Sequence, residues 1–129
     1  MFRYKWNFSV IGDYFTEEPE SKTVIQGNSV TLQCLVDENE TSKLNIPSPY
    51  MIQWVKGNLA LGFPPLRRER YDQKIGPKNF SLTIEDAQAE DEEDFECQIT
   101  AIGFRSKVSY VIMKCLQSLK IPFISYTGW

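Results

Sequence analysis

The chain has 129 residues, of which 42% are hydrophobic and 13% aromatic, so it can form one domain with a substantial core. Its 14 basic and 17 acidic side chains give a net charge of −3, which offers no electrostatic attraction for nucleic acid. Histidine is absent, which removes the most common general base, the most common metal ligand and every nucleophile that histidine activates. We therefore expect no enzyme, no cofactor, no metal site and no small-molecule substrate.

Residues 1–13 precede the expected domain as an N-terminal extension. The opening segment "MFRYKWNFSVIGDYF" carries early positive charge but lacks the continuous apolar stretch of a secretory signal. No run of about 18 apolar residues occurs, so the sequence predicts no membrane-spanning helix.

Four short segments alternate between apolar and polar residues, which is the pattern of half-buried β-strands. They are "SVTLQCLV" (29–36), "YMIQWVKG" (50–57), "NFSLTI" (79–84) and "DFECQITA" (94–101). Turn-forming residues separate them, as in "NIPSP", "GFPP" and "GPKN". Many short strands separated by turns predict an all-β fold, either a sandwich or a barrel.

Cys34, Trp54 and Cys97 lie on the apolar faces of three of these strands. Together with the run "DEEDFEC" (91–97), they resemble the core signature of the immunoglobulin superfamily. The resemblance covers roughly residues 14–113, which we take as one immunoglobulin-like domain. It implies a β-sandwich of the variable or intermediate type, in which a Cys34–Cys97 disulfide joins two antiparallel sheets beside a buried Trp54.

The acidic residues between Glu85 and Glu96 permit two interpretations. A calcium site would need oxygen ligands around a turn-forming glycine, but this stretch contains no glycine and no EF-hand spacing. The family resemblance instead implies a solvated corner in which Asp91 forms an ion pair with Arg70, and we favour this interpretation. Phe95 stands where the family usually has tyrosine, so its ring is expected in the core without the tyrosine hydroxyl.

The candidate binding surface lies on the second predicted strand and its neighbours. It is the face of these strands that points away from the core. Alternation and apolar character select Gln53, Val55, Leu59, Leu61, Phe63, Gln98 and Thr100. Apolar side chains rimmed by polar ones are typical of protein contacts. In the alternative interpretation, the leucines fold over the edge of the core and only Phe63 is exposed.

The string "IQWVKGNLALGF" (52–63) resembles the corresponding segment in the membrane-distal domain of the Kirrel/nephrin family of cell-adhesion receptors, as do "RRERY" and "FECQITA". In that family, the first domain binds its counterpart on an opposing cell through the face of strands C, F and G. The resemblance implies a recognition domain of a larger single-pass receptor at the cell surface, which binds an immunoglobulin-superfamily receptor or itself. The contacts implied position by position are Gln53, Val55, Leu61, Gly62, Gln98 and Thr100. A polar insertion at 37–50 departs from the family pattern.

Two other functions remain open at this point. One is an intracellular structural immunoglobulin module of a filament protein, and the other is a secreted single-domain immune-type binding protein. Sequons for N-glycosylation at Asn7, Asn39 and Asn79 favour a secretory route, and Asn39 in the polar insertion is the strongest acceptor candidate.

Residues 114–129, "KCLQSLKIPFISYTGW", form a C-terminal tail. The tail neither starts a second immunoglobulin domain nor forms a membrane anchor. We therefore expect a divergent or disordered tail on a fragment of a larger receptor, with Cys115 unpaired. In the alternative interpretation, the chain is a secreted protein that dimerises through Cys115.

Overall fold

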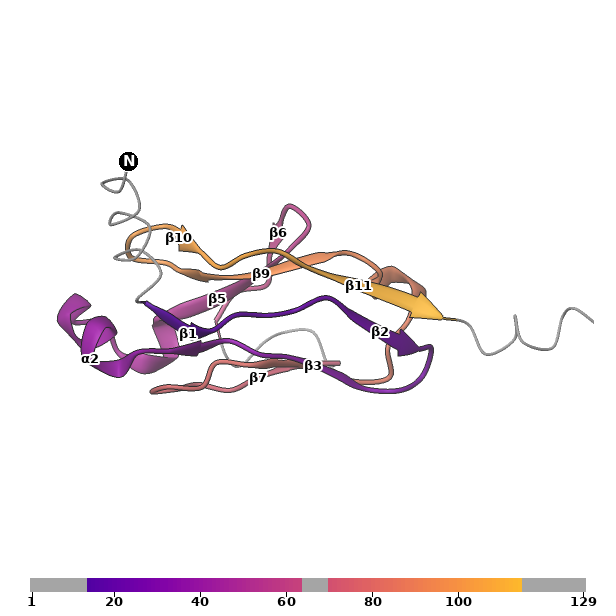
Figure 1. Ribbon diagram of the computed structural model, residues 1–129, viewed down its shortest axis with the longest axis horizontal. Coiled ribbons are helices and arrows are strands. Elements are labelled where there is room, and N and C mark those ends of the chain that lie inside the picture. The colour runs from indigo at the N-terminus through magenta and orange to yellow at the C-terminus, as the bar shows by residue number, and fades with distance from the viewer. Residues whose placement is uncertain (1–13, 64–69, 115–129) are drawn as a thin grey trace, which may run out of the picture.

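The computed structural model of the protein describes residues 14–63 and 70–114, in which short strands form two facing layers (Figure 1). Asn7, the extension at 1–13 and residues 115–129 of the predicted tail, with Cys115, lie outside these residues, whereas Lys114 is the last residue of a strand. Within the described ranges, no helix combines the length and the apolar character that crossing a membrane requires.

The first layer is built from strands that each turn one apolar face toward the core. Its strands are β3 (Val30–Leu32), β8 (Leu82–Ile84) and β7 (Tyr71–Gln73), paired antiparallel in that order, with β1 (Phe15–Glu17) and β4 (Leu35–Val36) paired beside them. The Phe80 N–H donates to the Cys34 carbonyl at 2.8 Å, and the Val36 N–H donates to the Lys78 carbonyl at 2.9 Å. These two bonds continue the ladder from β3 into β4.

The second layer carries the candidate binding surface. Its strands run in the order β2 (Lys22–Ile25), β11 (Ser109–Lys114), β9 (Asp94–Ile99), β5 (Ile52–Lys56) and β6 (Leu59–Ala60), and β10 (Phe104–Arg105) also pairs with β9. All these pairs are antiparallel except β2 with β11, which is parallel. The parallel pair arises because the chain changes layers between β1 and β2. The buried Pro19 in that stretch has no N–H with which to continue the first ladder.

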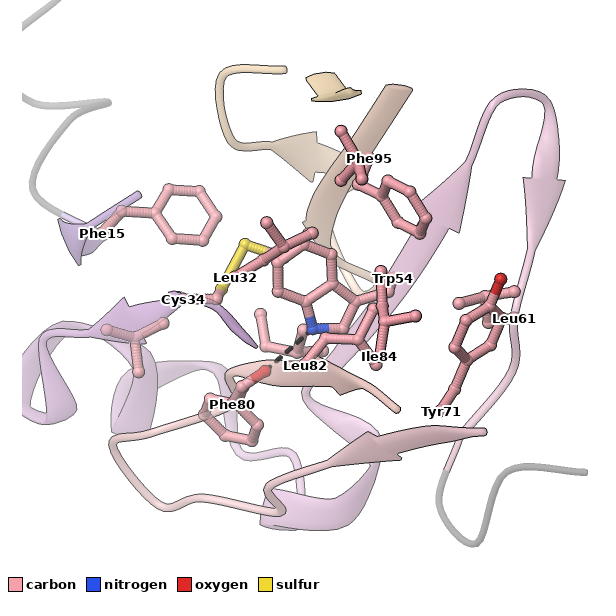
Figure 2. Close-up of a cluster of buried hydrophobic side chains, with 14 of the residues drawn as sticks. Phe15, Leu32, Cys34, Trp54, Leu61, Tyr71, Phe80, Leu82, Ile84 and Phe95 are labelled. Carbon is pink, nitrogen blue, oxygen red and sulfur yellow. Dashed lines mark hydrogen bonds between the residues drawn. A yellow bond between two sulfur atoms is a disulfide. The ribbon is translucent and has the colours of Figure 1, made fainter. Parts of the chain in front are cut away.

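The core lies between the layers, around Trp54 and a disulfide (Figure 2). Cys34 and Cys97 are bonded, with their Cα atoms 6.6 Å apart, and both are fully buried. The Trp54 indole N–H donates to the Phe80 carbonyl at 2.8 Å, which satisfies the polar atom of the largest buried side chain. The predicted immunoglobulin-like sandwich with a Cys34–Cys97 inter-sheet disulfide is therefore confirmed.

The polar insertion at 37–50 folds into short helical turns at one end of the sandwich (Figure 1). They are α2 (Glu38–Thr41) and the 3₁₀ turns η1 (Ser42–Leu44) and η2 (Ser48–Tyr50). Asp37 caps α2, because its Oδ1 atom accepts the Asn39 N–H at 2.9 Å. The buried Thr41 hydroxyl bonds back to the Asp37 carbonyl at 3.2 Å within the insertion, and the Asp37 N–H donates to the Tyr14 carbonyl at 2.9 Å, which ties the insertion to the domain.

Candidate functional site

The centre of the outer face is an amide pair on neighbouring strands. Gln53 of β5 lies opposite Gln98 of β9, and its Nε2 atom donates to the Gln98 Oε1 atom at 3.1 Å. Among the residues that the structure describes, the Gln53 Oε1 atom and the Gln98 amide nitrogen have no other side-chain partner. The pair therefore presents one acceptor and one donor side by side to anything that covers the face.

An ion pair borders the amide pair on β9. Glu96 precedes Gln98 by two residues on the same face, and its carboxylate lies 3.6 Å from the guanidinium of Arg105 on β10. Arg105 is opposite Gln98 in the ladder, so both amides and both charges belong to one patch. Because the two charges offset each other, the patch carries little net field.

The segment after β5 differs from the sequence expectation at its two leucines. Gly57, with φ at 59°, supplies the positive φ of a two-residue hairpin turn, which pairs Leu59 with Lys56. Leu59 is half exposed, but it shares the side of Lys56, whose side chain reaches toward the first layer. Leu61 is only 8% exposed and belongs to the core cluster (Figure 2). Leu61 therefore follows the alternative interpretation, in which the leucines of this segment fold over the edge of the core.

Val55 adds almost no surface to the face, although it points the same way as Gln53. It is 5% exposed. Gly62 has a φ of 93° and is half-buried, as is Phe63. Fewer of the predicted contact residues are therefore exposed on this face than the sequence suggested.

An aromatic corner lies where the insertion returns to β5. The rings of Tyr50 and Phe63 meet edge to face, with centroids 5.6 Å apart and planes at 81°. The Thr100 hydroxyl donates to the Tyr50 carbonyl at 3.0 Å, which places the corner beside the end of β9. Sequence reasoning missed Tyr50. The available signal was its place in the sequence, because an aromatic residue directly after the Pro-rich turn "NIPSP" is held at the start of a strand.

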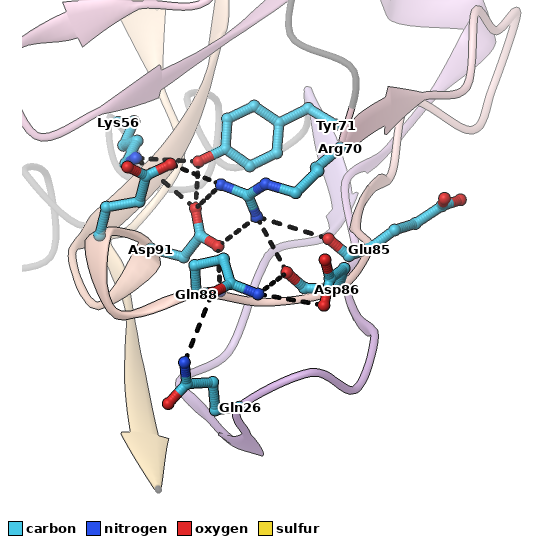
Figure 3. A network of polar contacts seen from close by, with 9 residues as sticks. Gln26, Lys56, Arg70, Tyr71, Glu85, Asp86, Gln88 and Asp91 are labelled. Carbon is cyan, nitrogen blue, oxygen red and sulfur yellow. Dashed lines mark hydrogen bonds and ion pairs between the residues drawn. The ribbon is translucent and has the colours of Figure 1, made fainter.

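A polar network lies around the 3₁₀ turn η3 (Ala89–Asp91), which precedes the start of β9, whereas the aromatic corner is beside the end of that strand (Figure 3). Asp91, at the end of η3, is fully buried and receives two bonds from the Arg70 guanidinium, at 2.6 and 3.3 Å. The Gln88 N–H donates to its Oδ2 atom at 2.7 Å, and the Tyr71 hydroxyl donates to its Oδ1 atom. The Lys56 ammonium lies 3.6 Å from the same carboxylate. The structure thus brings together Arg70 and Asp91, the ion pair proposed from the sequence.

The ionisation of this network follows from its geometry. Burial alone would raise the pKa of the Asp91 carboxyl, but the bonds from Arg70, Gln88 and Tyr71 outweigh it and hold that pKa below its usual range. The bond to Asp91 raises the pKa of Arg70, whereas burial is the main cause that raises the pKa of Tyr71. Both carboxylate oxygens of Asp91 are engaged by protein donors, as expected of a structural carboxylate.

Lys56 and Tyr71 are members of this network that sequence reasoning did not select. Lys56 shares the inward side of β5 with Ile52 and Trp54, and it donates to the Tyr71 hydroxyl at 2.9 Å. A lysine at an inward strand position was the available signal, because a buried ammonium needs a carboxylate partner. The Tyr71 ring also packs edge to face on Phe95, with centroids 6.5 Å apart. Phe95 itself is fully buried.

Two of the three sequons lie within the described residues. Asn39 is exposed in α2, and Asn79 is exposed before β8. The Asn79 Oδ1 atom accepts bonds from the Ser81 N–H at 2.9 Å and the Ser81 hydroxyl at 2.6 Å. Neither asparagine lies on β5, β9 or β10, the strands that carry the amide pair and the neighbouring ion pair.

A profile of the immunoglobulin domain family matches residues 14–100. The chain belongs to the immunoglobulin domain family. Kin of IRRE-like protein 1 of Rattus norvegicus is 31% identical over 97 residues, which cover 72% of this chain and 11% of that protein. Nephrin of Homo sapiens is 32% identical over 85 residues, which cover 63% of this chain and 6% of that protein. This immunoglobulin domain therefore spans about a tenth or less of the length of these relatives.

A solved structure with the same fold is the crystal structure of Dpr11 IG1 bound to DIP-gamma IG+IG2. The TM-score is 0.60 at 15% sequence identity, and the match covers 78% of this chain and 50% of that chain. At this identity the likeness concerns the fold alone.

Proposed function

We propose that this immunoglobulin domain is the recognition module of a cell-adhesion receptor at the cell surface. In the proposal, the outer face of β5, β9 and β10 binds another immunoglobulin domain on an opposing cell. The relatives, Kin of IRRE-like protein 1 and Nephrin, support this function, because the Kirrel/nephrin resemblance implies adhesion through the same face. In the solved structure with the same fold, Dpr11 IG1 is bound to DIP-gamma IG+IG2, so the fold is compatible with such pairing.

The observation that carries the proposal is the amide pair of Gln53 and Gln98. Their mutual bond leaves an acceptor and a donor at the centre of a nearly neutral face. A second copy related by a two-fold axis offers the matching groups. Across the axis, the Gln53 acceptor of one copy faces the Gln98 donor of the other, and the reverse holds for the second pair. A paralogue that retains both glutamines would satisfy the same requirement. We therefore take self-association as the first partner to test and a paralogue as the second.

The disulfide favours an extracellular location over an intracellular filament module. Cys34 and Cys97 are bonded in the core, and such bonds persist in oxidising compartments but rarely in the cytosol. Two exposed sequon asparagines agree with the same route.

The proposal predicts that Gln53→Ala weakens binding while the domain stays folded. The substitution leaves the partner's amide buried without a hydrogen bond, which costs roughly 1–3 kcal/mol, or about 5- to 150-fold in Kd. Sedimentation equilibrium of the full chain in a Cys115→Ser background measures self-association without interchain disulfides. Biosensor binding and cell aggregation with a candidate paralogue measure the heterophilic case.

Gln26→Ala is the matched control, because Gln26 is an exposed glutamine in the turn after β2 and away from the amide pair. Thermal melting verifies that both variants fold. If Gln53→Ala and Gln26→Ala both bind like the parent chain, the contact lies on another surface and the proposed face is wrong.

A further inference from the structure

We propose that Tyr50 is a specificity-determining contact of this interface, and that with Phe63 it forms an aromatic anchor against a second copy of the chain. This inference rests on the proposed function and deepens it. It concerns the insertion at 37–50, the segment in which this chain departs from the Kirrel/nephrin pattern. The insertion would thereby set partner preference instead of only lengthening a loop.

The first step is that the insertion holds Tyr50 in a fixed position. Pro47 and Pro49 flank Ser48 in η2, and the proline rings restrict the backbone of the turn. The Tyr50 N–H donates to the Pro47 carbonyl at 2.9 Å, and the Met51 N–H donates to the Ser48 carbonyl at 3.0 Å. Met51 is 5% exposed and packs in the core directly after the turn. An anchor ordered before binding loses less conformational entropy when the complex forms.

The second step is that Tyr50 remains available to a partner. Its side chain is 53% exposed, although the edge of the Phe63 ring supports it. A tyrosine has few rotatable bonds, a large apolar ring and a hydroxyl that can find a partner in an interface. These properties explain why tyrosine is enriched among residues that dominate binding energy.

The third step is that the corner is continuous with the amide pair. Thr100 follows β9 two residues after Gln98, and its hydroxyl bonds to the Tyr50 carbonyl at 3.0 Å. Its N–H donates to the Met51 carbonyl at 3.2 Å, which fixes the insertion against the same strand. A domain that covers Gln53 and Gln98 in the proposed way therefore lies next to the aromatic corner.

The occupant that fits this corner is a second copy of the chain. Tyr50, Phe63, Thr100 and the adjacent Gly62 carry no charge, and the ion pair of Glu96 and Arg105 neutralises the neighbouring patch. Two identical surfaces repel when they carry one sign of charge, and the described residues of this surface avoid that cost. A partner selected by electrostatic attraction would instead need a charged corner.

The test compares Tyr50→Ser with Tyr110→Ser in the full chain, again with Cys115→Ser. Tyr110 is a matched control, because it is 40% exposed on β11 of the same layer but lies opposite Asp94, at the far end of β9 from Thr100. Sedimentation equilibrium measures the self-association constant, and thermal melting verifies folding. We expect Tyr50→Ser to weaken association about tenfold or more, with Tyr50→Phe and Tyr110→Ser within about threefold of the parent. Phe63→Ser provides a second variant of the same anchor.

The outcomes separate the two proposals. If Gln53→Ala weakens association and both anchor variants bind like the parent, the face is right and the anchor is wrong. If Gln53→Ala and the anchor variants all bind normally, the proposed face is wrong and the anchor fails with it. If Tyr110→Ser loses as much affinity as Tyr50→Ser, the aromatic contribution is not specific to this corner, and the inference is overturned.

Discussion

Replacing Asp91 by alanine should destabilise the domain more than any neighbouring acidic substitution. The change removes a buried carboxylate, leaves the Gln88 N–H and the Tyr71 hydroxyl without their acceptor, and deprives Arg70 of its buried partner. Breaking a buried ion pair by removing one partner costs about 3–5 kcal/mol. Arg70 is 25% exposed and keeps its bond to Glu90, so we expect the lower end, about 3 kcal/mol. In a domain of this size, such a loss lowers Tm by roughly 10–20 °C.

A urea titration followed by tryptophan fluorescence measures this loss, and Glu92→Ala is the matched control. Glu92 is exposed, and from the residues that the structure describes it accepts only a long bond of 3.3 Å from the Met113 N–H, so its removal should change the free energy of unfolding by at most about 0.5 kcal/mol. Equal and small effects of Asp91→Ala and Glu92→Ala would show that the Arg70 contact contributes nothing to stability. The reasoning from burial would then be refuted.

The same carboxylate should make stability depend on pH. Because the folded state holds the pKa of Asp91 below its usual value of about 3.9, the stabilisation is fully present above that value. It is lost as the pH falls through the lower pKa of the folded state. The difference in unfolding free energy between the parent and Asp91→Asn should thus stay constant from neutral pH to about pH 5 and narrow below about pH 4. A difference that stays constant down to about pH 2 would contradict the pKa assignment.

Two further predictions concern the core and the network. Peptide mapping without reductant should find Cys34 bonded to Cys97, and a bond from either one to Cys115 would contradict the structure. Replacing both cysteines by alanine should lower the free energy of unfolding by about 4 kcal/mol, since the bond closes a loop with a sequence separation of 63. Tyr71→Phe should cost about 1 kcal/mol in the same urea titration, because it removes the hydroxyl bonds to Asp91 and Lys56, keeps the ring against Phe95 and leaves the Lys56 ammonium beside the Asp91 carboxylate. A loss as large as that of Asp91→Ala would show that the Tyr71 hydroxyl contributes as much to this corner as the carboxylate, and would contradict the expectation.

The core was predictable from the sequence because strand alternation has a strict period of two. Cys34, Trp54 and Cys97 fall on inward positions of their strands, and the fold buries all three. Arg70 and Asp91 could be paired only through the family resemblance, because they are far apart in the chain and their proximity depends on tertiary structure.

The position of Leu61 could not be obtained from alternation. β6 is only two residues long, so the face that Leu61 occupies is decided by the turn at Gly57 and not by strand periodicity. The helical turns of the insertion were missed because its polar composition resembles a loop. Asp37 followed three residues later by Glu40 was the available signal, since this spacing is typical of a helix N-terminus.

The six residues of β9 lie between the corner that holds Asp91 and the end at which Tyr50 lies, and at the usual rise of a strand they span about 20 Å. Substitutions in the two regions should therefore act almost independently on the molecule. Under the proposed interface, a duplicated gene could change its surface at Gln53 or Tyr50 and acquire a new partner without first gaining a compensating stabilising mutation. Divergence of related receptors toward distinct partners would then be limited by which surfaces still match, and not by which chains still fold.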